Sequence, residues 1–130
     1  MKTLNKLRDE IHEYAINKGF WDKERETGTL LMLCVSELAE AMEADRKSRY
    51  ADLEAYRSCT MADDILSEDF DIYLESSFEK LIKDTFEDEL ADTIIRILDL
   101  CGAKGIDIEK HIETKMKYNQ TRERMHGKKY

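Results

Sequence analysis

Apolar residues recur at three- and four-residue spacing near the start of the chain, which is the period of an amphipathic α-helix. The apolar positions of this first segment are Leu4, Leu7, Ile11, Tyr14 and Ala15. Thr3 has a side chain suited to capping the first turn, and Gly19 stands where a helix would stop. The pattern predicts a helix from Thr3 to about Lys18.

Two longer apolar segments predict two further helices. After a polar connection that ends near Gly28, the segment from Leu30 to about Tyr50 changes from apolar to charged, and its first half is expected in the core. The next apolar segment predicts a third helix from Phe78 to Cys101, ended by Gly102.

The end of the chain predicts a fourth helix. Gly105 interrupts the chain, Asp107 can cap a new helix, and that helix is expected to run to about Arg124. Residues 126–130 are expected to form a loose basic tail.

Between the second and third predicted helices lies an acidic insert, about Ala51 to Ser77, which is expected to be broken helix and loop. From Ala51 to Asp92 acids outnumber bases 14 to 3, whereas Thr93 to Tyr130 has nine bases and five acids. The charge is therefore polarised along the chain. Two roles are open for the insert: it covers a site, or it contacts a partner subunit.

The composition favours an all-α fold. Proline is absent and glycine occurs five times in 130 residues, so the chain lacks the residues that many short strands and tight turns require. Hydrophobic residues make up 42% and charged residues 38%, a balance that permits a core and argues against disorder. At this length, residues 1–130 are expected to form a single domain.

The net charge of -8 would repel a phosphate backbone, so no nucleic-acid polymer is expected as a partner. A free nucleotide is compatible with this charge, because a bound cation can offset it locally. Cys34, Cys59 and Cys101 lack metal-binding spacing and are expected to be reduced thiols. Without an apolar stretch long enough for a signal peptide or a membrane span, the protein is expected to be cytoplasmic and free of the membrane.

Two pairs of carboxylates interrupt apolar helical faces. Glu37 projects from the predicted buried face of the second helix, and Glu40 lies at its edge. Glu89 and Asp92 belong to a narrow polar stripe on the third helix. Burying an unpaired carboxylate costs roughly several kcal/mol or more. If the two helices pack side by side, the four carboxylates require a cation between them.

The ligand chemistry of these pairs favours a hard divalent ion. Carboxylate oxygens are the ligands of Mg²⁺ and Mn²⁺, and the absence of histidine from both pairs argues against zinc. Mg²⁺ also bridges carboxylates to substrate phosphates. The alternative for each pair is a solvated helical face with charges at i and i+3.

Lys115, Asn119 and Arg122 lie at four- and three-residue spacing on the fourth helix, on the side predicted to face the core. Two cations and an amide in this position can hold a phosphate chain. The alternative is a salt-bridge network with acids of a neighbouring helix. Arg96 is expected to be such an internal partner rather than a ligand.

Aromatic and histidine residues give a weaker signal. Trp21 is expected either to cover a helix end or to stack on a nucleobase. The three histidines, His12, His111 and His126, are scattered and are expected at the surface, with none placed as a general base.

In order along the chain, these motifs resemble those of the MazG-like all-alpha nucleoside triphosphate pyrophosphohydrolases. The motifs are Glu37-Leu-Ala-Glu40, Glu89-Leu-Ala-Asp92 and Lys115-Met-Lys-Tyr-Asn119-Gln-Thr-Arg122, followed by His126-Gly-Lys-Lys. Lys18 to Trp21 also looks like the family's N-terminal region. The resemblance covers most of the chain but leaves out the acidic insert.

The resemblance implies a four-helix-bundle-like domain of the MazG type that assembles as a homo-oligomer, a dimer or a tetramer. It also implies hydrolysis of (deoxy)nucleoside triphosphates between the alpha and beta phosphates, which releases a monophosphate and pyrophosphate. Such an activity would serve to clean the nucleotide pool. Deoxynucleoside triphosphates are the preferred expectation for the substrate.

The family's site residues carry over onto matching positions. By this resemblance Glu37, Glu40, Glu89 and Asp92 are catalytic and bind Mg²⁺, and one of them orients the attacking water. The phosphates would be held by Lys115, Asn119 and Arg122, and Trp21 would border the base pocket.

Two other functions stay open at this point. One is a non-catalytic helical interaction protein whose acidic insert binds a basic partner, for which residues 63–71 would be essential. The other is a degenerate enzyme that binds nucleotide without cleaving it, which the intact acidic set disfavours.

Overall fold

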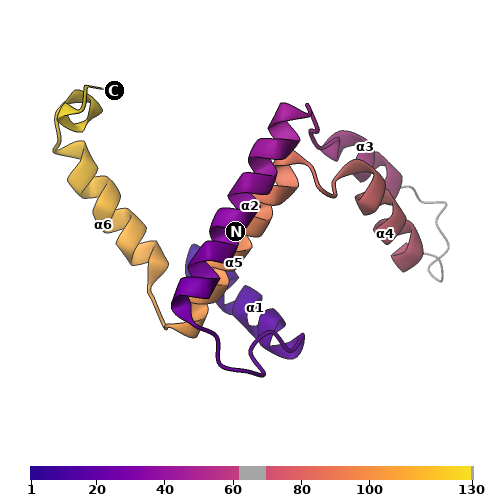
Figure 1. The fold of residues 1–130 in the computed structure, drawn as a ribbon, viewed down its shortest axis with the longest axis horizontal. Coiled ribbons are helices and arrows are strands. Elements are labelled where there is room, and N and C mark those ends of the chain that lie inside the picture. The colour runs from indigo at the N-terminus through magenta and orange to yellow at the C-terminus, as the bar shows by residue number, and fades with distance from the viewer. Residues whose placement is uncertain (62–69, 130) are drawn as a thin grey trace. The chain divides into compact units, whose positions relative to one another are not determined.

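The structure is a computed structural model that describes residues 1–61 and 70–129. In that part of the chain every regular element is helical, and no strand occurs (Figure 1). The elements are α1 (Leu4–Asn17), α2 (Thr27–Arg46), α3 (Leu53–Thr60), α4 (Phe70–Leu81), α5 (Phe86–Ala103), α6 (Ile108–Gln120) and the 3₁₀ helix η1 (Arg124–Gly127). The predicted all-α fold class is confirmed. None of the helices in the described ranges is long and apolar enough to cross a membrane.

The chain divides into two compact units. The first unit comprises Met1–Glu26 with Ile97–Tyr130, and the second comprises Thr27–Arg96. The first therefore contains α1, the last turns of α5, α6 and η1. The second contains α2, α3, α4 and the larger part of α5.

In the first unit, both predicted helix caps are confirmed. The Thr3 hydroxyl accepts a hydrogen bond from the Lys6 amide at 3.2 Å, and the Asp107 carboxylate accepts one from the Lys110 amide at 3.0 Å. Asn5 joins the starts of α1 and α6, because its side-chain amide donates to Asp107 at 2.7 Å. These contacts join the start of α6 to the start of α1.

The two glycines near the ends of α1 and α5 have different roles. Gly19, at φ +83, takes the left-handed conformation that ends α1, as predicted. Gly102 was predicted to end the third helix, but α5 continues to Ala103. A Cβ at Gly102 would lie 2.5 Å from the Cβ of His12, so this glycine allows α1 to approach α5 closely.

In the second unit, α2 runs antiparallel to the first part of α5, since the amide of Phe86 at the start of α5 donates to the carbonyl of Arg49 beyond the end of α2. The buried stripe of α2 is formed by Leu30, Cys34, Glu37, Ala41 and Ala44. The helix ends at Arg46 rather than near Tyr50, because Ser48 adopts a positive φ of 54 and the Arg49 amide bonds to the Ala44 carbonyl.

The prediction of a single helix from Phe78 to Cys101 is wrong. α4 ends at Leu81 and α5 begins at Phe86. Between them Asp84 has a positive φ of 59, and its amide donates to the Asp88 carboxylate at 3.0 Å. The Thr85 hydroxyl accepts from the Asp88 amide at 3.4 Å. These two side-chain bonds to backbone amides start a new helix inside a segment whose apolar spacing looks continuous.

The acidic insert is partly helical, as the prediction of broken helix and loop allowed. α3 and α4 pack against one another, and the rings of Tyr56 and Phe78 meet edge to face with centroids 6.1 Å apart. Residues 62–69 of the insert, which include most of the 63–71 segment singled out above, lie outside the described residues.

α6 differs from its prediction in length and in burial. It ends at Gln120 instead of about Arg124, because the Thr121 and Arg122 amides bond to carbonyls three residues earlier and tighten the last turn. No residue of α6 is buried, and Ile112 is 42% exposed. The face that was expected to be core is therefore open to solvent in the single chain.

Candidate metal centre

Three carboxylates of the second unit come together. Glu37 of α2 and Glu89 and Asp92 of α5 each offer an oxygen within 4.8 Å of the others. We call these three residues the carboxylate cluster. Glu37 and Glu89 are buried, at 7% and 5% exposure, and Asp92 faces solvent. The cluster thus has two buried members and one accessible member.

The cluster follows from helix geometry. Glu89 and Asp92 are three residues apart, so they lie on one face of α5. Glu37 belongs to the buried stripe of α2, one turn from Cys34 and one from Ala41. Antiparallel packing of α2 against α5 brings this stripe to the face of Glu89 and Asp92. The predicted convergence of these three acids is confirmed.

Crowding changes the acidity of the cluster. Burial raises the pKa of Glu89 to about 7, with further contributions from the charge of Glu40 and from a hydrogen bond and the charge of Glu37. Burial and the charge of Asp88 raise the pKa of Asp92. Ionised carboxylates are therefore disfavoured here unless a cation neutralises them.

Arg96 supplies one positive charge at this point. Its Nε donates to the Oε1 of Glu37 at 2.6 Å, in an ion pair between a buried carboxylate and a partly exposed guanidinium. The prediction that Arg96 is an internal salt-bridge partner is confirmed. One guanidinium leaves the cluster with excess negative charge when all three acids are ionised.

Glu40 does not belong to the cluster, although it lies near it. It is exposed, and its charge raises the pKa of both Glu89 and Asp92. With Glu43, Arg49, Asp84 and Glu89 it lines a cavity of about 180 Å³. Of the four predicted ligands, three form the cluster and the fourth stands beside it.

The cluster suits a small hard cation. Oxygens on opposite sides of a Mg²⁺ ion lie about 4.2 Å apart, since each bond is about 2.1 Å. Three oxygens within 4.8 Å can therefore close around such an ion with small side-chain movements. The donor set consists of carboxylates only, which is the chemistry of Mg²⁺ and Mn²⁺ sites and not that of structural zinc sites.

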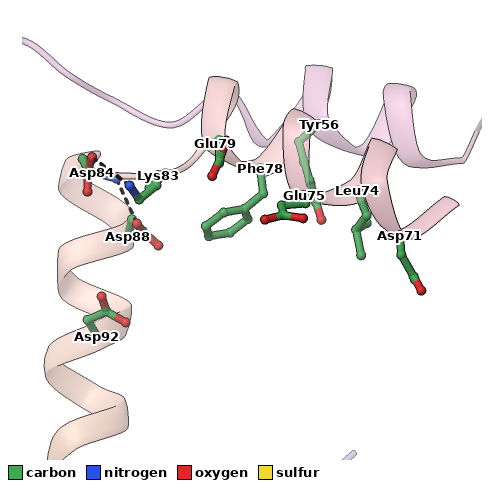
Figure 2. A pocket seen from close by; sticks show the side chains of 10 residues that line it. All are labelled: Tyr56, Asp71, Leu74, Glu75, Phe78, Glu79, Lys83, Asp84, Asp88 and Asp92. Carbon is green, nitrogen blue, oxygen red and sulfur yellow. Dashed lines mark hydrogen bonds and ion pairs between the residues drawn. The ribbon is translucent and has the colours of Figure 1, made fainter. Parts of the chain in front are cut away.

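An acidic cavity adjoins the cluster through Asp92. This cavity has a volume of about 520 Å³. Figure 2 shows the side chains that line it, which come from the α3–α4 pair and the start of α5. Its lining residues are Tyr56, Asp71, Leu74, Glu75, Phe78, Glu79, Lys83, Asp84, Asp88 and Asp92. Tyr56 was not singled out from the sequence, because the insert lacks a periodic pattern, and Phe78 was predicted only as the start of the third helix. The insert's excess of acids was the available signal.

In the first unit, His12 and Trp21 both contact Asp99. The indole Nε1 of Trp21 donates to the two Asp99 oxygens at 3.0 and 3.1 Å, and His12 Nδ1 lies 2.7 Å from Oδ1. The His12 and Trp21 rings meet edge to face at 5.3 Å. His12 was expected at the surface, but its side chain is partly buried, at 21% exposure. Its close packing against Gly102 covers part of it.

Lys115, Asn119 and Arg122 also belong to the first unit, on and just after α6. Lys115 and Arg122 flank the Tyr118 ring, with their charges 5.1 and 5.7 Å from its centroid. Neither cation pairs with a carboxylate in the described ranges. The alternative of a salt-bridge network therefore has no support from the described residues.

Two further details mark this basic group. Arg122 donates to the backbone oxygen of His126 at 3.1 Å. The Oδ1 atom of Asn119 is buried and has no hydrogen-bond partner among the described residues. A buried acceptor without a donor is costly, so this atom is available to a donor from outside the chain.

Comparison of the chain with protein-family models, with curated proteins and with solved structures gave no match.

Proposed function

We propose that this protein is a Mg²⁺-dependent nucleoside triphosphate pyrophosphohydrolase of the MazG type. The observation that carries the proposal is the carboxylate cluster, in which Glu37, Glu89 and Asp92 converge from two helices with little positive charge to balance them. Buried carboxylates that repel one another reduce stability. A function that requires a bound cation explains why the chain retains them.

In the proposed reaction the cluster and Glu40 hold the metal. Mg²⁺ held there would supply polarisation of the phosphoryl oxygens and would offset the negative charge that develops on them. Glu37 and Glu89 are fixed by burial within the helix pair, whereas Asp92 and Glu40 are exposed to an entering substrate. One of these carboxylates orients the water that attacks the phosphoanhydride between the alpha and beta phosphates.

Lys115, Asn119 and Arg122, on and just after α6, hold the phosphates in this proposal. Lys115 provides a point charge and Arg122 a planar fork for phosphate oxygens. Support comes from two features: both cations lack a carboxylate partner in the described residues, and Asn119 has an unsatisfied buried acceptor. Trp21 borders the nucleobase, with its indole held by Asp99.

We also propose that the chain forms a homo-oligomer of four-helix-bundle-like subunits in the cytoplasm. The residues Leu31, Val35, Leu38 and Met42 follow heptad spacing on α2, and each is 49–52% exposed. Ile94 and Ile95 of α5 are exposed as well. No large side chain is fully buried in the described part of the chain. A second copy that covers these apolar residues would supply the missing burial.

A second candidate function is a non-catalytic protein that binds a basic partner. The acidic cavity of Figure 2 favours it, because six carboxylates line the cavity and Lys83 is the sole base among its lining residues. In that case Glu75→Gln and Glu79→Gln should abolish partner binding, while Glu37 and Asp92 would matter only for packing.

The experiment that separates these functions resolves the products of nucleotide hydrolysis. Purified protein is incubated with canonical and modified nucleoside triphosphates, in Mg²⁺ and in chelator, and monophosphate, diphosphate, pyrophosphate and orthophosphate are quantified. We expect metal-dependent release of monophosphate and pyrophosphate from some members of the panel, deoxynucleotides first.

If the products are diphosphate and orthophosphate, the protein cleaves the terminal phosphoanhydride, and the proposed cleavage between the alpha and beta phosphates is wrong. Absence of turnover, from protein shown to be folded and oligomeric, would favour the binding protein.

A further inference from the structure

Arg96 contacts the carboxylate cluster but has no part in the proposed reaction. Its ion pair with Glu37, 2.6 Å long, joins the two helices that provide the cluster. The two ends of the pair differ in exposure: the Glu37 side chain is 9% exposed and the Arg96 side chain 38%. The carboxylate is therefore confined, and the guanidinium has open space beside it.

We infer that Arg96 is the resident counter-ion of the metal-free cluster, and that a divalent cation displaces it from Glu37. This inference rests on the proposed metal site. Arg96 is a positioning residue in this account, because it acts on the cluster through Glu37.

Competition for one carboxylate drives the exchange. Glu37 both receives the Arg96 hydrogen bond and offers a ligand oxygen to the cluster. A divalent cation in the cluster would repel a guanidinium bound to the same carboxylate, since like charges at this separation interact strongly in partly buried surroundings. Arg96 has the long, partly exposed side chain, so it moves while Glu37 stays.

The displaced guanidinium becomes a group that can bind phosphate. The hydrogen bond recorded for Arg96 uses Nε, so both Nη groups lack an acceptor among the described residues. Arg96 is four residues after Asp92 and lies on the same face of α5. Released from Glu37, its planar fork suits the oxygens of a metal-bound di- or triphosphate. Metal binding would in this way prepare the site for substrate.

The first test observes the pair directly in the wild-type protein. The Nε–H group of Arg96, assigned by NMR through the loss of its signal in Arg96→Lys, is followed while Mg²⁺ is added. We expect its proton shift to move towards that of a solvated arginine, and its exchange with water to accelerate, as the metal saturates. An unchanged signal at metal saturation would overturn the inference while leaving the metal site intact.

The second test measures two affinities that removal of Arg96 should change in opposite directions. Arg96→Gln should bind Mg²⁺ at least about fivefold more tightly, because the metal no longer competes with the guanidinium, and should bind inorganic pyrophosphate at saturating Mg²⁺ at least about fivefold more weakly. Calorimetric titration measures both affinities. Lys47→Gln is the matched control, since Lys47 pairs with Glu43 on α2, outside the cluster, and should change neither affinity greatly.

The outcomes distinguish failure of the Arg96 exchange from failure of the proposed metal site. Weaker or equal Mg²⁺ binding by Arg96→Gln would overturn the exchange, and unchanged pyrophosphate binding would overturn the phosphate role. If the wild type binds no Mg²⁺, the proposed metal site fails and the inference fails with it. Should Arg96→Gln not fold, the NMR titration of the wild type still decides.

Discussion

Glu89 is the residue whose protonation is most closely tied to folding. Its folded-state pKa of about 7 lies above the usual value of 4.5, because it is buried beside Glu37 and near the charge of Glu40. The folded chain therefore binds a proton more tightly than the unfolded chain. The stabilisation is fully present below about pH 4.5 and is lost as the pH rises to about 7.

A pH prediction follows for the metal-free protein. In chelator, the Glu89→Gln variant should lack this loss of stability, so the wild type should weaken relative to the variant between about pH 4.5 and 7, by at most about 3 kcal/mol. Urea unfolding at a series of pH values measures the difference. Comparison with the variant is needed because Glu43 and Asp107, whose pKa values are lowered by Lys47 and Asn5, contribute slopes of opposite sign to both proteins.

Glu13→Gln on α1 is the control, since this glutamate is exposed and outside the cluster. Parallel pH profiles for wild type and Glu89→Gln would contradict the assignment of Glu89 as a strained, buried carboxylate.

At the scale of elements, the contact between α1 and α5 depends on a glycine. Gly102→Ala would place a methyl group 2.5 Å from the Cβ of His12, so the two segments must separate. We expect a loss of about 1–3 kcal/mol in the free energy of unfolding, despite the higher helix propensity of alanine.

Gly28→Ala is a matched control for this prediction. Gly28 lies in the first turn of α2, and a Cβ there meets nothing within 4 Å. This variant should be neutral or more stable by up to about 1 kcal/mol. Equal effects of the two substitutions in urea unfolding would show that Gly102 has no special packing role.

Local sequence signals predicted helix caps well and helix continuity poorly. Thr3 and Asp107 cap α1 and α6 as expected, because a side-chain oxygen before an apolar run leads directly to a hydrogen bond. The break between α4 and α5 was missed, because Thr85 and Asp88 lie inside an unbroken apolar pattern and neither proline nor glycine marks the turn. The signal that identifies such a break is a threonine followed three residues later by an acid, here Thr85 and Asp88.

The site could be predicted to the extent that helix periodicity determines it. Glu37 and Glu89 converge because each occupies a face that packing buries, and Asp92 lies three residues from Glu89 on the same side of α5. The contact of His12 with Asp99 could not be read from spacing, since these residues are 87 positions apart and their approach depends on the absence of a side chain at Gly102.

At the scale of the whole molecule, the apolar residues of α2 predict self-association. Leu38→Glu places a charge in the middle of the stripe formed by Leu31, Val35, Leu38 and Met42. We expect this variant to remain helical but to dissociate to the monomer, because burying an unpaired carboxylate in an interface is unfavourable. Light scattering coupled to size-exclusion chromatography measures the mass.

Ile16→Glu is the control for association, since Ile16 on α1 is similarly exposed but lies outside this stripe. An oligomer that survives Leu38→Glu, or a monomeric wild type, would show that α2 is not the interface.

The most direct test of the proposed activity measures pyrophosphate release at increasing Mg²⁺ by wild type, Asp92→Asn and Glu43→Gln. Asp92 belongs to the carboxylate cluster, whereas Glu43 is an exposed acid of α2 that pairs with Lys47. We predict that wild-type turnover saturates with Mg²⁺ and that Glu43→Gln behaves like the wild type. We expect Asp92→Asn to lose at least about 100-fold in turnover, since changing residues that merely support metal ligands already costs about 10–100-fold. Wild-type turnover in chelator, or full activity of Asp92→Asn, would contradict the proposed activity.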